Sequence, residues 1–290
     1  MAFYLYAKYD QMNLRYLWTG FVAAMVIYSC GASEALHQTR IPSADTLARQ
    51  QKVMALRSIP VEMFDSLVFE NKSGRLPYRF LRAPEPVAKK YPLVIVFHGS
   101  GAVGTDNRGQ VGILAKYFAD SLNRRAFPAF VIVPQFPSRS SNYVMDSTRA
   151  VLRSIMQPCG EMALALIDHY RHDPRIDTNR IYVVGFSMGA STVTNVISRH
   201  PEWFAAAVSI SGIPQFDQLD RLQKFPLMLI HGNADNENPI DSDRRFFGEI
   251  SQKKNAKTSL IEYNGLGHNE MQQEIVSRRN WAEWLFSIQK

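Results

Sequence analysis

The strongest structural signal in this chain is Arg180-Ile181-Tyr182-Val183-Val184-Gly185-Phe186-Ser187-Met188-Gly189. Its first half is a β-branched and aromatic run typical of a buried strand, and a helix-compatible stretch follows at residues 190–198. Between them lies Gly-x-Ser-x-Gly, a pattern in which small neighbours keep a serine hydroxyl exposed on a sharp turn. The segment therefore predicts a nucleophilic Ser187. The alternative is an ordinary glycine-rich turn that buries the serine.

Two later segments supply the groups that would activate such a serine. Residues 226–230 read as a buried strand, and the loop after it carries Asp235. Residues 258–263 read as the last strand, and a glycine-containing loop leads from it to His268. The chain order serine, acid, histidine is that of a triad on an open α/β sheet. We expect His268 to take the proton of Ser187 and Asp235 to orient His268.

Other acids and histidines fit these roles less well. Asp241 and Asp243 are alternative acids, but a helix expected to begin near residue 239 places both in its first turn. His231 lies too close to Asp235 in the chain and is expected to be structural, as is His98. The remaining histidines lie on segments with helix or loop patterns and are expected to face solvent: His37, His169, His172 and His200.

Backbone N–H groups are needed to stabilise the oxyanion of an acyl-transfer intermediate. The N–H of Met188, directly after the serine, is the first expected donor. The second is expected from Ser100 or Gly101, in a glycine-rich loop that follows the apolar run at residues 92–97. That loop lacks the residue spacing of a phosphate-binding loop.

Taken together, residues 98–101, 185–189, Asp235 and 267–268 resemble the α/β-hydrolase superfamily over residues 61–290. Smaller motifs resemble bacterial carboxylesterases related to polyhydroxybutyrate depolymerases and feruloyl esterases: Thr105-Asp106-Asn107, Pro134-Gln135, Arg180-Ile181-Tyr182, Gly-Phe-Ser-Met-Gly and Trp284-Leu285-Phe286-Ser287. Ala190 departs from that group, which often has a glycine there. The resemblance implies a serine esterase that forms an acyl-enzyme on small or carbohydrate-linked acetyl or feruloyl esters.

The apolar runs alternate with helical patterns, which predicts an α/β fold with a mostly parallel sheet and helices on both faces. Residues 64–82, with a turn signal at residues 71–74, read as an antiparallel hairpin at the sheet edge. Residues 212–225 are too few for a large lid.

The loop over residues 135–160 has two interpretations. Either it walls the substrate cleft, or it is surface decoration with one helix over residues 146–156. Under the first interpretation, the expected substrate contacts are Gln135, Phe136 and Tyr143, with Phe186 from the serine turn.

The first thirty residues read as an export signal. Arg15 precedes an apolar run at residues 17–28 that is short for a membrane span, and the true start is expected at Met12 or Met1. The context of Cys30 resembles a bacterial lipoprotein cleavage site, which implies lipidation of Cys30. Cleavage to a secreted form, or an uncleaved anchor, are the alternatives. We expect an exported protein that meets a membrane only through this end.

The remaining chain divides into a polar tether and initial helix at residues 31–60 and a catalytic domain at residues 61–290. The full 290-residue chain has a net charge of +7, which comes from scattered lysines and arginines and argues against a nucleic-acid partner. We expect no cofactor and no metal site, and Cys159 is left without a disulfide partner in this domain. A serine peptidase and a non-catalytic binding protein of the same fold remain alternatives, and the oligomeric state is open.

Overall fold

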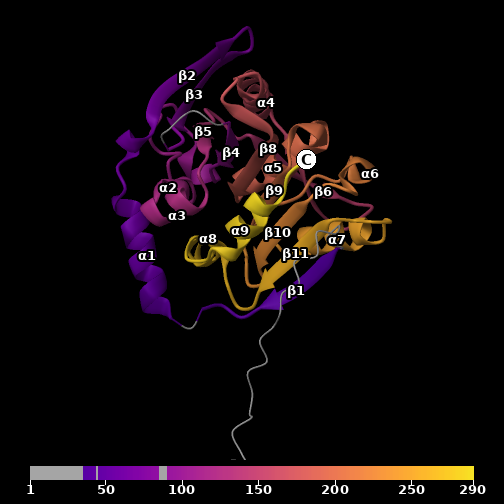
Figure 1. Cartoon of the computed structure of the whole chain (residues 1–290). Coiled ribbons are helices and arrows are strands. Elements are labelled where there is room, and N and C mark those ends of the chain that lie inside the picture. The colour runs from indigo at the N-terminus through magenta and orange to yellow at the C-terminus, as the bar shows by residue number, and fades with distance from the viewer. Residues whose placement is uncertain (1–34, 44, 85–89) are drawn as a thin grey trace, which may run out of the picture. The chain divides into compact units, whose positions relative to one another are not determined.

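The computed structural model describes residues 35–43, 45–84 and 90–290, all within the unit Ala32–Lys290. Within these residues lies a nine-stranded sheet with the spatial order β1-β11-β10-β9-β8-β4-β5-β3-β2 (Figure 1). Its strands are β1 (Leu36–Arg40), β2 (Asp65–Asn71), β3 (Gly74–Leu81), β4 (Tyr91–Phe97), β5 (Phe130–Pro134), β8 (Ile176–Phe186), β9 (Ala206–Ile210), β10 (Leu227–Gly232) and β11 (Thr258–Tyr263). A separate pair consists of β6 (Ser141–Asp146) and β7 (Val151–Met156).

Helices connect most of these strands. They are α1 (Thr46–Ser58), α2 (Ile113–Ala119), α3 (Ser121–Ala126), α4 (Pro158–Arg171), α5 (Met188–Arg199), α6 (Leu219–Leu222), α7 (Asp241–Ser251), α8 (His268–Val276) and α9 (Asn280–Ser287). Short 3-10 turns lie at Val61–Met63, Ser100–Ala102 and Pro201–Trp203.

Neighbouring strands from β1 through to β5 run parallel, whereas β3 and β2 are antiparallel. The hairpin expected at residues 64–82 is confirmed as β2 and β3, whose Asn71 and Gly74 pair at the turn. The α/β fold class is therefore confirmed. The strands β1, β11, β10, β9, β8, β4 and β5 all point the same way. The loops that follow them therefore meet at one edge of the sheet, where such folds place their ligands.

The core has two layers because side chains alternate along each central strand. On β4, Val94 and Val96 join one buried cluster with α2, α8 and α9, while Leu93, Ile95 and Phe97 join the other with α4, α5 and α7. Burial on both faces explains why these strands read as continuous apolar runs.

The N-terminal part of this unit differs from its prediction. The helix expected within residues 31–60 is α1, but residues 36–40 form β1 and pair in parallel with β11 instead of forming a tether. The unpaired edge of β11 offers backbone groups that need partners, and β1 satisfies them. Its side chains are mostly exposed, so no apolar pattern marks it in the sequence.

Residues 135–160 also differ from their prediction, because β6 and β7 form a hairpin where one helix was expected over residues 146–156. The side-chain nitrogen of Asn195 on α5 donates to the buried hydroxyl oxygens of Ser141 and Ser154, at 3.0 and 3.2 Å. Asp146 closes the turn by accepting the backbone N–H groups of Thr148 and Arg149. The sequence shows no alternation of apolar and polar residues along these two strands, because their buried contacts are polar.

The connection between β9 and β10 carries only the four-residue helix α6, so the expected lack of a large lid there is confirmed. Within the described ranges, no helix is both long enough and apolar enough to cross a membrane. The predicted export signal, the start at Met12 and the lipidated Cys30 lie outside the described residues.

Candidate active site

Ser187 occupies the sharp turn between β8 and α5. Its backbone φ of 57° lies in the left-handed region, which non-glycine residues rarely adopt. A Cβ at Gly185 would lie 2.3 Å from the carbonyl oxygen of Gly189, and one at Gly189 would lie 2.3 Å from that of Phe97. The two glycines of the motif are therefore required by close backbone approach, and the strained serine turn predicted from the sequence is present.

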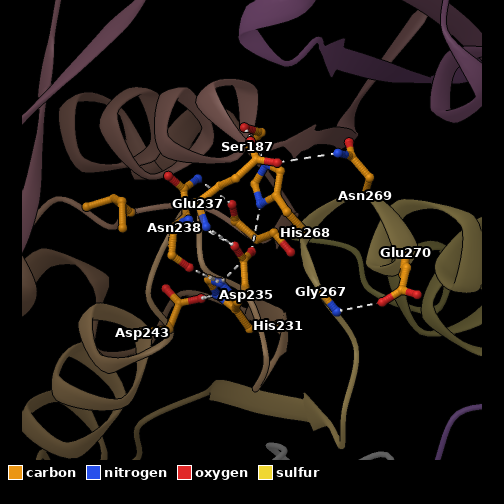
Figure 2. A network of polar contacts seen from close by, with 12 residues as sticks. Ser187, His231, Asp235, Glu237, Asn238, Asp243, Gly267, His268, Asn269 and Glu270 are labelled. Carbon is orange, nitrogen blue, oxygen red and sulfur yellow. Dashed lines mark hydrogen bonds and ion pairs between the residues drawn. The ribbon is translucent and has the colours of Figure 1, made fainter.

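The structure brings together the three predicted side chains, which come from three separate loops at the carboxyl ends of β8, β10 and β11 (Figure 2). Ser187 Oγ lies 2.8 Å from His268 Nε2, and His268 Nδ1 lies 2.6 Å from Asp235 Oδ2. A neutral imidazole that donates from Nδ1 to the carboxylate presents its Nε2 lone pair to the hydroxyl. The arrangement is able to remove a proton from Ser187.

Backbone contacts hold the acid next to the base. Ala234 N donates to Leu266 O at 3.1 Å, which ties the loop after β10 to the loop after β11. Asp235 Oδ1 accepts the backbone N–H groups of Glu237 and Asn238, each at 2.9 Å, so that Oδ2 remains for His268. The carboxylate is thus oriented from its own loop.

The charge on Asp235 follows from the same contacts. Burial alone would raise the pKa of Asp235, but hydrogen bonds from His231, His268 and the backbone of Asn238 outweigh it and hold this pKa well below its usual range. Asp235 is therefore ionised at neutral pH, the state that orients and stabilises a histidine base.

Neither alternative acid reaches His268. Asp241 begins α7 as expected and its side chain is exposed. Asp243, in the same turn, is fully buried and pairs with His231 at 2.7 Å. The structure therefore favours Asp235 over both.

The glycine-rich loop after β4 lies against the serine. A Cβ at Gly99 would lie 3.4 Å from the Cβ of Ser187, and Ser100 and Gly101 line the same cavity as Ser187. α5 begins at Met188, so first-turn N–H groups of that helix lie beside the serine. The residues expected to hold an oxyanion are thus gathered around Ser187.

His98 fastens this loop. Its Nδ1 contacts Gly99 O at 2.8 Å, and its Nε2 accepts the N–H of Phe136 at 3.0 Å. Burial lowers the pKa of His98 to about 4, against a raising contribution from the Gly99 carbonyl. A neutral His98 with its proton on Nδ1 satisfies both contacts, in agreement with the structural role expected.

A cavity of about 460 Å³ opens at Ser187. Apart from the loop and triad residues already named, its lining includes apolar and amide side chains and one carboxylate: Leu114, Ala115, Phe186, Gln110, Asn269, Gln272 and Glu237. The described residues that line it include no lysine or arginine. Glu237 Oε2 lies 3.9 Å from His268 Nε2, so the one carboxylate among the described lining residues faces the reacting groups.

The expected substrate contacts Gln135, Phe136 and Tyr143 do not line the cavity at Ser187, so these three predictions are corrected. Gln135 is buried, and its amide donates to Asp106 Oδ1 at 2.7 Å and to Ala102 O at 3.3 Å, so it braces the loop after β4. Phe136 is fully buried and packs on His98, with ring centroids 5.2 Å apart. Both positions follow directly after β5, where the next side chains turn under the loop instead of into the cleft.

Tyr143 lies on the β6–β7 hairpin. Its hydroxyl is 3.2 Å from Ser191 Oγ on α5, and it is absent from the lining of the cavity at Ser187. No residue between 135 and 160 lines that cavity, so this segment does not wall the cleft at Ser187. Phe186 does line it and packs on the ring of His268 at 4.8 Å between centroids.

The sequence reasoning missed Glu237, Asn269 and Gln272. The first follows the acid by two residues, and the other two lie in the first turns of α8 behind the base. Asn269 Nδ2 donates to Glu237 Oε1 at 3.3 Å, linking the two loops (Figure 2). Nearness in sequence to the acid and the base was the available signal.

The comparison with known families agrees with this geometry. The family model "Dienelactone hydrolase family" matches residues 80–279, more than half of the chain. The chain belongs to the dienelactone hydrolase family. The expected α/β-hydrolase superfamily is thereby confirmed, whereas the closer likeness to polyhydroxybutyrate depolymerases and feruloyl esterases stays a prediction.

Two relatives of this dienelactone hydrolase family member are esterases by name. One is "Putative esterase NocK" of Nocardia uniformis subsp. tsuyamanensis, 26% identical over 231 residues that cover 76% of this chain and 64% of the relative. The other is the crystal structure of a thermostable esterase, with a TM-score of 0.69 and 26% identity over 79% of this chain and 64% of that one. The chain thus spans less than two thirds of the length of both relatives.

More distant structures share the fold. FphF, a fluorophosphonate-binding serine hydrolase of Staphylococcus aureus, has a TM-score of 0.56 at 14% identity and covers 77% of this chain and 97% of its own. Porphyromonas gingivalis dipeptidyl peptidase 4 also has a TM-score of 0.56 at 14% identity, over 78% of this chain and 35% of its own. Likeness at this identity supports the α/β architecture alone.

Proposed function

We propose that the protein is a serine esterase that hydrolyses carboxylic esters through an acyl-enzyme on Ser187. The observation that carries the proposal is the continuous contact from Ser187 Oγ through His268 to an ionised Asp235 at the mouth of a cavity. Both esterase relatives named above support an ester substrate in preference to an amide.

The reaction would use each group at a stated atom. His268 Nε2 takes the proton of Ser187 as Oγ bonds to the ester carbonyl carbon, and Asp235 stabilises the imidazolium that forms. The oxyanion is held by the N–H of Met188 and by an N–H of Ser100 or Gly101. The C–O bond to the alcohol then breaks, and His268 returns its proton to that alkoxide.

The acyl-enzyme is resolved by water. His268 removes a proton from the water as its oxygen attacks the acyl carbon, and the proton passes to Ser187 Oγ as the free acid leaves. The N-terminal end of α5 at Met188 favours the negative charge in both tetrahedral intermediates.

The cavity narrows the substrate class. Its volume suits a small molecule or one end of a larger ester. Phe186, Leu114 and Ala115 offer apolar contact, and amide side chains offer hydrogen bonds to hydroxyl groups. Glu237 disfavours an anionic substrate, and no lysine or arginine among the described lining residues would attract one. We therefore propose neutral esters, with acetyl or feruloyl groups on carbohydrate as the preferred class.

One experiment tests the proposal directly. The purified protein is treated with a fluorophosphonate and measured by intact-mass spectrometry, and the same sample is assayed on p-nitrophenyl acetate. A single adduct that maps to Ser187, with ester turnover that Ser187→Ala lowers by several orders of magnitude, is the expected result. A folded sample that gives neither adduct nor turnover would favour the non-catalytic binding protein.

The peptidase alternative is tested with matched leaving groups. The acetyl ester of p-nitrophenol and the acetyl amide of p-nitroaniline present the same acyl group to Ser187. We expect turnover of the ester only, and turnover of N-terminally free peptide anilides at comparable kcat/KM would move the assignment to a peptidase.

A further inference from the structure

His231 lies behind the acid, on the side away from His268. Its side chain is fully buried at the end of β10, and Nδ1 lies 2.7 Å from Asp243 Oδ2 on α7. Its Nε2 lies 2.9 Å from Asn238 O and 3.2 Å from Asp235 Oδ2. A second imidazole and carboxylate thus extend the chain of contacts from Ser187 (Figure 2).

The position of one proton follows from these partners. Asn238 O is an acceptor and so is the ionised Asp235, which requires that His231 Nε2 carries a hydrogen. The atom facing Nδ1 is a carboxylate oxygen of Asp243, so the proton between them is shared by that pair. Whichever atom holds it, the hydrogen on Nε2 is donated to Asn238 O at 2.9 Å, with Asp235 Oδ2 3.2 Å from the same nitrogen.

The surroundings favour a charged imidazole. Burial lowers the pKa of His231, but Asp235 and Asp243 outweigh it and raise this pKa to about 9. The other titratable groups nearby are His268 on α8 and Glu262 on β11, and Glu262 is already paired with Arg244 and His37. No described lysine or arginine is in ion-pair contact with Asp235 or Asp243, which leaves His231 as the cationic group that both acids contact.

We propose that His231, held by Asp243, is a positioning residue. It orients the carboxylate of Asp235 and reduces the effect of that negative charge on His268. The proposal rests on the esterase function proposed above. Asp235 Oδ2 is shared by both histidines, whereas Oδ1 is held by two backbone N–H groups. Without His231, Oδ2 would have His268 as its one side-chain donor among the described residues, and its full charge would act on that imidazole.

The alternative is a role in folding alone, because the same contacts also fasten α7 to β10. The two roles predict different kinetics. Loss of a positive charge beside Asp235 makes protonation of the base easier, so that the neutral base is lost at a higher pH as the pH falls. A purely structural contact would leave the pH profile unmoved.

The test uses two replacements that divide the functions of the imidazole. In His231→Gln the amide nitrogen reaches the position of Nε2 and keeps a donor toward Asp235 without the charge. In His231→Asn the shorter amide reaches only toward Asp243. We expect the acid limb of kcat/KM against pH to move up by about one unit in His231→Gln. We expect His231→Asn to lose about 10- to 100-fold in kcat, with KM little changed.

Two further variants keep the test decisive. Asp243→Asn removes the counter-ion that raises the pKa of His231. We expect His231 then to lose its proton, so that the positive charge beside Asp235 is lost and the acid limb rises as in His231→Gln; this variant serves if His231→Gln does not fold. Phe246→Leu loosens the buried face of α7 one turn away and is expected to lower Tm while leaving the acid limb in place. An acid limb unchanged in both His231→Gln and Asp243→Asn would overturn the proposal.

Wild-type protein is measured first by ester turnover and by fluorophosphonate labelling of Ser187. Failure there would refute the esterase function. Wild-type activity with unshifted variants would refute the role of His231 alone.

Discussion

Replacement of Asp235 by asparagine is the sharpest perturbation of this site. Two backbone N–H groups point at Oδ1 of Asp235, so the amide of asparagine must place its oxygen there and its NH2 at the position of Oδ2. That NH2 then faces His268 Nδ1, which lies 2.6 Å from Oδ2. As a donor it requires an unprotonated Nδ1, and the imidazole proton moves to Nε2.

The magnitude follows from that change of tautomer. With a hydrogen on Nε2, His268 presents a donor to Ser187 Oγ at 2.8 Å and is unable to take its proton. The same replacement in a serine protease lowers kcat about 10⁴-fold, and the geometry here calls for a loss of that order, about 5.5 kcal/mol in activation free energy. At the position of Oδ2 the NH2 also faces the N–H of His231, 3.2 Å away, and this contact between two donors opposes the orientation that the two backbone N–H groups at Oδ1 favour.

The assay is kcat/KM on p-nitrophenyl acetate at pH 7 to 8, with Tm and fluorophosphonate labelling rate on the same samples. Asp241→Asn is the matched control, because Asp241 is an exposed acid at the start of α7, and we expect it to leave activity unchanged. A loss below about tenfold in Asp235→Asn, with its fold intact, would refute the reasoning that Asp235 sets the tautomer of His268.

Four other predictions concern separate parts of the molecule. Gly189→Ala places a Cβ 2.3 Å from a carbonyl oxygen of β4, so it should lower the free energy of unfolding in urea by about 3 kcal/mol or more. Gly248→Ala, where a Cβ meets open space, is the control and should not destabilise the protein. Stability should fall as the pH drops from about 6.5 through about 4, because the unfolded chain protonates His98 before the folded one does; His98→Gln should flatten that slope. Glu237→Gln should raise kcat/KM for p-nitrophenyl hemisuccinate relative to p-nitrophenyl butyrate by about three- to tenfold, less at high salt, since Glu237 is 63% exposed; an unchanged ratio would refute its role in selection. Cys30→Ser should move the protein from the membrane to the soluble fraction of a bacterial host, and retention in the membrane would favour an uncleaved anchor.

Much of the fold was predictable because the central strands are buried on both faces. Their apolar runs, such as residues 92–97 and 258–263, are visible without knowledge of any partner. The elements that escaped prediction, β1 and the β6–β7 hairpin, have polar sequences whose order depends on contacts with distant residues. Edge pairing with β11 and hydroxyl contacts with α5 leave no periodic apolar signal.

For the site, local sequence specified Ser187, Asp235 and His268, because a strained serine turn needs glycines at fixed positions and the acid and base follow the ends of buried strands. Tertiary structure alone decided what surrounds them. It turned Gln135 and Phe136 under the loop after β4, brought Glu237 to the cavity and placed Asp243 against His231. Those contacts join residues from separate elements, and only the packing of α7 and the loops against the sheet sets their distances.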